Sequence, residues 1–183
     1  REEQDNYSIE SYNRAIKAWE DGFFKGQVFP VEVKSKKTTT VVDRDEDVSK
    51  YQGPEKLRTL PSAFGPESMI TAGNASGIND GAAATIVFGE EKKNALGIRP
   101  TAKILGYANA ALEPDWFTIA PIQAIRKLCD KLSIKPSDVD LYEINEAFAV
   151  VAIVAIRELK LDPAKVNMAG GAVAIGHPIG ATG

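Results

Sequence analysis

The stretch that most constrains this chain is its glycine-rich end, residues 169–183, which reads AGGAVAIGHPIGATG. Five of these fifteen residues are glycines. Such a density indicates backbone packed close to another group, or held in conformations that only glycine adopts at low cost. The only histidine of the chain, His177, lies between Gly176 and Pro178, whose φ is fixed by its ring. The sequence therefore predicts a loop that aims one imidazole in a defined direction.

A second informative stretch, residues 145–160, begins NEAFAVVAIVAI. We expect Asn145 at the point where a strand ends and a helix begins, beside the unpaired N–H groups and positive dipole of a helix N-terminus. The helix expected over residues 147–160 is apolar on all sides for three turns, which is typical of a helix buried between layers. We interpret Glu146 as an acid favoured by the dipole of the early helix, with no role in carrying protons.

Hydrophobic spacing and turn residues predict alternating helices and strands. A stripe of Ile9, Tyr12, Ile16 and Trp19 indicates an amphipathic first helix, with Gly22 as its C-cap. The charged residues 34–56 are expected to form a surface loop. Helices are predicted at residues 3–21, 90–96, 121–132 and 147–160, and strands at residues 28–33, 81–88, 101–108, 139–144 and 166–168.

Composition excludes several function classes. A net charge of −3 gives no basic field that would favour nucleic acid. The longest apolar run, residues 147–156, is too short to cross a bilayer, and the polar opening REEQDNYS is no secretory signal. The single cysteine, Cys129, excludes an internal disulfide and fits a reducing compartment. It lies on the apolar stripe of the helix at residues 121–132, so we predict a buried side chain without a catalytic role.

Three motifs together resemble one family. TAGNASGINDGAAA at residues 71–84, NEAFA at 145–149 and GGAVAIGHPIG at 170–180 are similar to the signatures of the thiolases, in the same order and spacing. The similarity runs along nearly the whole chain and is strongest with the biosynthetic type that joins two acetyl groups. It implies an α/β chain with the layered α-β-α-β-α thiolase fold. On this basis both ends look cut, and the chain is expected to be an internal segment of a longer enzyme.

The resemblance also implies a division of the chain and a reaction. Residues 1–78 would belong to the loop domain that binds coenzyme A, residues 79–100 would end the N-terminal domain, and residues 101–183 would form most of the C-terminal domain. The implied reaction is the Claisen condensation of two acetyl-CoA to acetoacetyl-CoA and CoA, and the reverse thiolysis. Its nucleophilic cysteine and second catalytic cysteine would lie outside this chain, so the segment alone is expected to be inactive.

The resemblance assigns roles to residues of the three motifs. His177 would activate the cysteine as a base and help bind the thioester oxygen, since an imidazole exchanges protons near neutral pH. Asn145 would hold a water that donates to the same oxygen, completing an oxyanion hole. The residues implied in binding coenzyme A or substrate are Tyr12, Lys50, Lys56, Phe64, Ala72, Gly73, Ser76, Ala147 and Phe148. A potassium ion is a further possibility, at Tyr12, Ala72, Gly73, Ala75 and Val173.

Simpler interpretations compete at several of these positions. Tyr12 and Phe64 could be packing residues, and Lys50 and Lys56 could lie on a solvated loop. For the whole chain, the alternatives are a degradative 3-ketoacyl-CoA thiolase of fatty-acid β-oxidation and a non-catalytic acyl-CoA-binding protein of the same fold. No prosthetic group is expected. The implied partners are coenzyme A and its acetyl and acetoacetyl esters, within a homodimer or homotetramer that is mitochondrial or cytoplasmic and touches neither nucleic acid nor membrane.

Overall fold

The longest element is helix α1, Glu2–Glu20, in a computed structural model that describes residues 1–182. The helix ends in a Schellman arrangement, in which the N–H of Gly22 donates to the carbonyl of Trp19 and that of Phe23 donates to Ala18. Gly22 has a φ of +74°, a conformation that glycine adopts without a steric penalty. The predicted first helix and its glycine end are confirmed.

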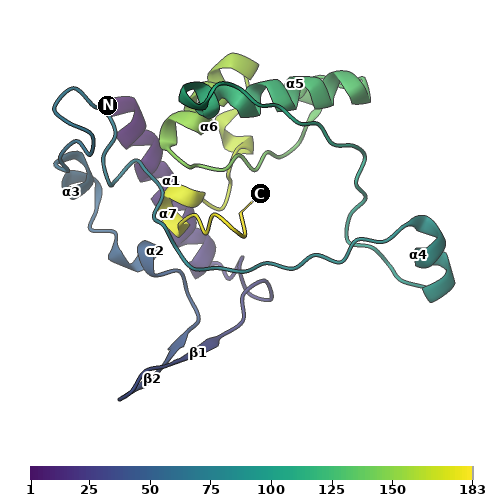
Figure 1. Cartoon of the computed structure of the whole chain (residues 1–183), viewed down its shortest axis with the longest axis horizontal. Helices are drawn as coiled ribbons and strands as arrows, with labels where there is room; N and C mark the ends of the chain where they lie inside the picture. Colours follow the sequence, from purple (N-terminus) through teal and green to yellow (C-terminus); the bar gives the residue numbers. More distant parts are fainter. Residues whose placement is uncertain (183) are drawn as a thin grey trace.

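The face of α1 that packs against the protein differs from the predicted one. The apolar stripe is only half-buried, whereas the most buried positions carry small or polar side chains: Gln4, Asp5, Ser8, Ser11, Ala15 and Ala18. Small side chains let a neighbouring backbone approach a helix closely. That neighbour is the short helix α7, Ala172–Ile175, which lies beside α1 near the middle of Figure 1.

The main hydrophobic core lies between helices α5, Ala120–Leu132, and α6, Ala149–Leu159, at the top of Figure 1. Its buried members are Ile122, Ile144, Val151, Ala152, Ala155, Leu161 and Val166. Both helices are as predicted, although α6 begins two residues late, with Phe148 as its N-cap. Cys129 on α5 is buried, as expected from the apolar stripe.

The loop predicted for residues 34–56 is wrong. Strand β1, Val31–Lys34, pairs antiparallel with β2, Thr39–Val42, with Val31 opposite Val42. Helices α2, Glu46–Lys50, and α3, Pro54–Arg58, follow. The many charged residues of this segment favoured the prediction of a loop, although the β-branched run at residues 39–42 favours a strand. The strand predicted at residues 28–33 is therefore real but begins later, and Figure 1 shows its hairpin projecting from the body.

The strands predicted at residues 81–88 and 101–108 do not form. Both segments are irregular and exposed, with Ile86 at 87% and Leu105 at 71% exposure, so the burial expected for residues 81–88 is also wrong. A strand needs a neighbour to pair its N–H and C=O groups, and within residues 1–182 the only sheet is the hairpin. Helix α4, Glu90–Leu96, lies between the two segments and ends at Gly97 in the left-handed conformation, as predicted.

The strands predicted at residues 139–144 and 166–168 are reduced to one parallel bridge between Tyr142 and Val166. The N–H of Tyr142 donates to Lys165, and the N–H of Asn167 donates back to Tyr142, at 2.8 and 2.9 Å. This bridge still brings the two chain segments side by side, and both of its residues pack in the core cluster that includes α6. Short 3₁₀ helices complete the chain: η1 at Pro114–Ile119, η2 at Pro136–Asp138 and η3 at Pro163–Lys165.

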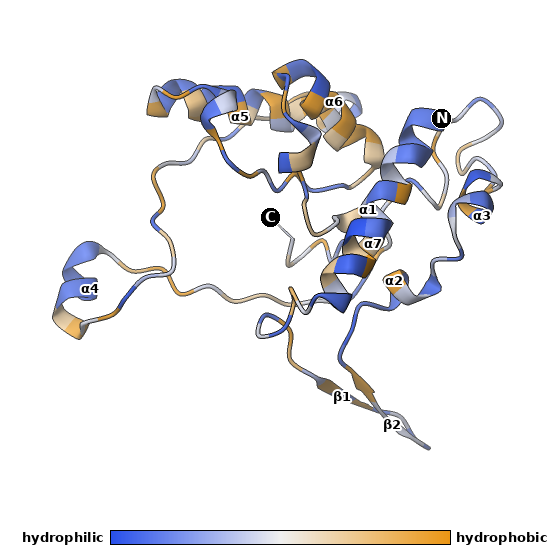
Figure 2. Ribbon diagram, turned by 180° about the vertical axis from the view of Figure 1, so that it is seen from behind, coloured by the Kyte–Doolittle hydropathy of each residue, from blue (hydrophilic) through white to orange (hydrophobic). Residues whose placement is uncertain are grey.

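Hydropathy is distributed unevenly over the elements. Figure 2 shows α6 mostly in apolar colours, whereas α1 and α4 are largely polar. This contrast agrees with the burial of α6 in the core and with the exposure of every residue of α4 except Lys93, which is half-buried. Within residues 1–182, the structure has no helix that combines the length and the apolar character needed to cross a membrane.

Candidate active site

The two residues predicted to act together, Asn145 and His177, meet in the structure. The Nδ2 atom of Asn145 lies 3.3 Å from the Nε2 atom of His177, although 32 positions separate them in the chain. Asn145 is exposed and His177 is half-buried, so the pair opens to the surface. The expectation that a helix begins at Asn145 is wrong, because α6 begins only at Ala149. The loop of residues 145–148, rather than a helix N-terminus, presents its side chain.

The backbone around His177 fixes the direction of the ring. Gly176 has a φ of +89°, which a side chain would disfavour, and its Cα faces the half-buried side chain of Asn79. The N–H of His177 donates to the carbonyl of Gly77 at 2.9 Å, and Pro178 packs on Gly81. The Nδ1 atom of the ring is buried without a hydrogen-bond partner, so Nε2 is the nitrogen that faces Asn145. The glycine-rich end therefore does hold one imidazole in place.

The third motif, residues 71–84, is joined to the other two by hydrogen bonds. The N–H and the hydroxyl of Ser76 both donate to the carbonyl of Ala147, at 3.1 and 3.0 Å. The N–H of Ala149 donates to the carbonyl of Asn74 at 2.9 Å. Since His177 is bonded to Gly77, this loop touches both sides of the Asn145–His177 pair. The hydrogen of the Ser76 hydroxyl is engaged with protein, so only the lone pairs of its oxygen remain for a ligand.

A pocket of about 280 Å³ borders Asn145. Ala147 and Phe117 line it, and the ring of Phe148 lies 6.2 Å from the ring of Phe117. Ala147 and Phe148 were predicted to bind coenzyme A or substrate, whose pantetheine arm is the part that suits an apolar wall. Their half-buried position beside this mainly apolar pocket is compatible with contact to such an arm, and both also pack on the main core.

Several residues predicted to bind coenzyme A lie on exposed elements. Lys50 on α2 is paired with Glu46 and Asp47, at 3.3 and 3.5 Å, and Lys56 is exposed on α3. Phe64 is 73% exposed on a turn, so its interpretation as a core residue is wrong. An exposed aromatic ring remains available for a flat ligand such as adenine.

The residues predicted to hold potassium lie on α1, on α7 and in the loop of the third motif. Tyr12 and Val173 belong to one cluster with Ala149 and Ile153 of α6, and the N–H of Ala149 donates to Asn74 of that loop. The ring of Tyr12 stacks on Tyr51 at 4.4 Å, and burial, followed by the charge of Asp47, raises its pKa to about 12. Ala72, Gly73 and Ala75 lie in the loop of the third motif, where Gly73 packs on Leu57. Carbonyl and phenol oxygens suit potassium chemically, and the ion stays a prediction.

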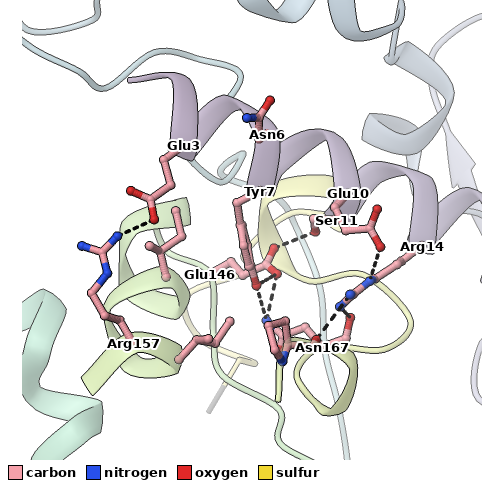
Figure 3. Close-up of a pocket in the computed structure, with 12 residues that line it drawn as sticks. Glu3, Asn6, Tyr7, Glu10, Ser11, Arg14, Glu146, Arg157 and Asn167 are labelled. Carbon is pink, nitrogen blue, oxygen red and sulfur yellow. Dashed lines mark hydrogen bonds and ion pairs between the residues drawn. The ribbon is translucent and has the colours of Figure 1, made fainter. Parts of the chain in front are cut away.

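Glu146 is the residue of this region that sequence reasoning misjudged. It precedes α6 and is completely buried. Its carboxylate accepts hydrogen bonds from Tyr7, Ser11 and Asn167 (Figure 3), and from the backbone N–H of Val173. Burial and the neighbouring Glu146 carboxylate raise the pKa of the Tyr7 phenol above its ordinary range, so Tyr7 remains a donor at neutral pH. The sequence signal for this position was an acid directly before the apolar run of residues 147–156.

The pocket drawn in Figure 3 is separate from the Asn145–His177 pair. It measures about 400 Å³ and opens between α1 and α6 on the side of Glu146. Its charged groups are paired with protein: Glu3 with Arg157, Glu10 with Arg14, and Glu146 with its four donors. A ligand would find few free polar groups there, so we assign the chemistry to the pair that opens to the surface.

Cys129 does not take part in this site. It lies on α5, and burial raises the pKa of its thiol, which disfavours the thiolate that a nucleophile requires. The prediction that Cys129 is a packing residue agrees with this position. Within residues 1–182, no three or more His, Cys, Asp or Glu side chains gather in a way that could hold a metal ion.

Comparison with known proteins decides the family. The sequence profile of the thiolase N-terminal domain matches residues 1–91, and that of the thiolase C-terminal domain matches residues 98–183. The chain belongs to the thiolase family. An acetyl-CoA acetyltransferase of Yarrowia lipolytica is 48% identical to this thiolase over 183 residues, which are 100% of the chain and 46% of the relative. A probable acetyl-CoA acyltransferase of Staphylococcus aureus is 44% identical over 184 residues, covering 100% and 47%.

Solved structures support the same assignment. The acetyl-CoA acetyltransferase of Bacillus anthracis superposes on this thiolase with a TM-score of 0.95 at 43% identity, covering 100% of the chain and 46% of that structure. A thiolase of Ascaris suum, solved with coenzyme A, gives a TM-score of 0.88 at 42% identity and covers 100% and 47%. The chain therefore has the thiolase fold, and it spans about half the length of the relatives it matches.

Proposed function

We propose that this chain is part of an acetyl-CoA acetyltransferase, which joins two acetyl-CoA into acetoacetyl-CoA and CoA and catalyses the reverse thiolysis. The observation that carries the proposal is the 3.3 Å approach of Asn145 to His177 within three joined thiolase motifs. The names of the relatives from Yarrowia lipolytica and Bacillus anthracis support the acetyl substrate. Coenzyme A as the carrier is supported by the Ascaris suum thiolase that was solved with it.

In this proposal, His177 and Asn145 act on the thioester oxygen of the second acetyl-CoA. When the methyl group of that thioester loses a proton, negative charge develops on the oxygen as an enolate. In the complex with substrate, an N–H on Nε2 of His177 and a water held by Asn145 would donate to this oxygen, in place of the contact that Nδ2 of Asn145 makes with Nε2 in the structure. Both are positioned before the charge develops, so little reorganisation is needed in the transition state.

The same imidazole would also serve the first half of the reaction as a base. A cysteine thiol gives its proton to His177, and the resulting thiolate attacks the first acetyl-CoA and releases CoA as a thiol. The enolate then attacks the acetyl-cysteine and displaces the cysteine as a thiolate. Since Cys129 is buried on α5, the proposal requires that the reacting cysteine, and the second cysteine that exchanges the methyl proton, are contributed from outside residues 1–183.

Two finer parts of the proposal concern the ion and the assembly. Potassium would stabilise the loop of residues 71–76 through carbonyl oxygens, with Tyr12 contributing its phenol. A homodimer or homotetramer in the mitochondrion or cytoplasm is proposed by analogy with the family alone. Gel filtration with light scattering tests the assembly, and the rate measured in potassium chloride against choline chloride tests the ion.

The test is a thiolysis assay on the complete protein that contains this chain. Acetoacetyl-CoA and a longer 3-ketoacyl-CoA are each offered with free CoA. We expect cleavage of acetoacetyl-CoA at least about tenfold faster, since extra methylenes change binding by this order. The Cys129→Ala variant is the control, and it should retain the wild-type rate.

The outcomes of this assay distinguish the proposed acetyltransferase from its two alternatives. Equal cleavage of the longer substrate would favour the degradative thiolase. If the protein binds CoA but cleaves neither substrate, the remaining interpretation is the non-catalytic acyl-CoA-binding protein. Loss of activity in Cys129→Ala, in a variant that remains folded, would contradict the assignment of the nucleophile to a cysteine elsewhere.

A further inference from the structure

Glu146 differs from every other acidic side chain of the chain in its surroundings. It is completely buried, and none of the ion pairs found within residues 1–182 includes it. A buried charge without an opposite charge is unfavourable unless hydrogen bonds compensate for its lost hydration. Because Glu146 follows Asn145 directly in the chain, its buried carboxylate bears on the geometry of the candidate active site.

The hydrogen bonds of Glu146 reach three separate parts of the fold. Its Oε1 atom accepts from the hydroxyl of Tyr7 and from Nδ2 of Asn167, both at 2.8 Å. Its Oε2 atom accepts from the hydroxyl of Ser11 at 2.8 Å and from the N–H of Val173 at 3.1 Å. Tyr7 and Ser11 belong to α1, and Val173 lies in the first turn of α7. Figure 3 shows the side chains of Tyr7, Ser11 and Asn167 converging on the carboxylate.

These contacts connect the two halves of the catalytic pair. Asn145 is the residue before Glu146, and His177 follows α7 directly after Gly176. Gly171 lies directly against the carboxylate, and its N–H donates to the hydroxyl of Ser11 at 3.0 Å. A movement of the Asn145 loop relative to α7 would therefore break bonds at Glu146.

We propose that Glu146 is a positioning residue: its buried carboxylate fixes the Asn145 loop to α7 and thereby sets the distance between Asn145 and His177. The inference rests on the function proposed above for that pair. Glu146 itself touches neither substrate nor the reacting atoms. It acts through the geometry of two residues that do.

The arrangement requires a carboxylate rather than an amide of the same shape. Each oxygen of Glu146 faces one donor that cannot become an acceptor, the N–H of Val173 on one side and Nδ2 of Asn167 on the other. The Asn167 amide cannot turn over, because its Oδ1 accepts from the N–H of Ile144 while its Nδ2 donates to the Ile144 carbonyl. In a Glu146→Gln variant, the new NH₂ group would oppose a donor in either orientation.

The test compares Glu146→Gln with two controls in the complete protein. Tyr7→Phe removes one hydrogen bond from the same carboxylate but introduces no opposed donor. Ile122→Ala creates a cavity in the core between α5 and α6, so it lowers stability at a site that does not contact Asn145 or His177 directly. Folded protein is quantified for each variant, and kcat and KM for acetoacetyl-CoA are determined per folded molecule. The imidazole carbon-bound proton signals of His177, identified by their loss in His177→Ala, report the geometry independently of activity.

We expect Glu146→Gln to lower kcat by about 10- to 100-fold, because small misplacements of catalytic groups have effects of this size. KM should change little, the imidazole signals should shift, and both controls should stay near the wild type. An unchanged kcat per folded molecule, or an equal loss in Ile122→Ala, would overturn the positioning role and leave the proposed function intact. If the wild type cleaves neither substrate, the proposed function fails, and the positioning role is judged from the imidazole signals alone. A shift found only in Glu146→Gln would support the positioning role. No shift in Glu146→Gln would overturn it.

Discussion

Replacing His177 with alanine is expected to lower kcat for acetoacetyl-CoA cleavage by about a thousandfold or more. The change removes a proton acceptor, which contributes about 10²–10⁴ in rate, and an oxyanion donor, which contributes about 10²–10³. The two losses are not multiplied, because groups that act as one unit are not additive. The rate of cleavage is measured on the complete protein by the loss of the acetoacetyl-CoA absorbance.

The structure indicates that His177→Ala removes the imidazole without disturbing the loop that carries it. The side chain of His177 contacts Asn145, while the bond that anchors the loop comes from the backbone N–H of His177 to Gly77 and survives the substitution. The fold around the loop should therefore persist, which circular dichroism and the melting temperature verify. A folded His177→Ala variant that cleaves acetoacetyl-CoA within about tenfold of the wild type would contradict both roles of the imidazole.

The largest effect on stability is expected for Gly170→Ala. Gly170 has a φ of +78°, and a Cβ at this position would lie 2.5 Å from the carbonyl oxygen of Ser11 and 2.8 Å from the backbone nitrogen of Ala15. A left-handed residue other than glycine costs about 1–2 kcal/mol, and overpacking adds about 1–3 kcal/mol. We expect the free energy of unfolding to fall by about 3 kcal/mol, as measured by urea denaturation.

A control for this variant lies in the same segment. A Cβ on Gly180 would meet nothing within 4 Å, and Gly180 is not among the glycines with positive φ. Gly180→Ala should therefore unfold within about 0.5 kcal/mol of the wild type. Equal stabilities for the two alanine variants would show that Gly170, two residues before α7, does not pack on α1 as closely as the structure places it.

Residue type and local spacing predicted the parts of the fold that depend on neighbouring residues. Helices α1, α4, α5 and α6 carry their own signals, as in Gly97, which ends α4 in the left-handed conformation. The pairing of Asn145 with His177 was predicted through the resemblance of three motifs, because no local rule connects residues 32 positions apart. What the motifs could not indicate is that the loop of Ser76 joins the other two through its backbone.

The failures have a common physical cause, which is that burial depends on partners distant in the chain. Residues 81–88 have the composition of a buried strand, but no other segment within residues 1–182 pairs with them, so Ile86 is exposed. Glu146 precedes an apolar helix and was read as its first turn, whereas its four donors come from α1, α7 and Asn167.

The measurement that tests the central claim most directly is the steady-state kinetics of Asn145→Ala in acetoacetyl-CoA cleavage. If Asn145 holds a donor for charge that develops only in the transition state, kcat falls by about 10²–10³ while KM stays within a few-fold. A raised KM with unchanged kcat would mean that Asn145 binds substrate and transition state equally. That result would contradict the oxyanion role of the pair.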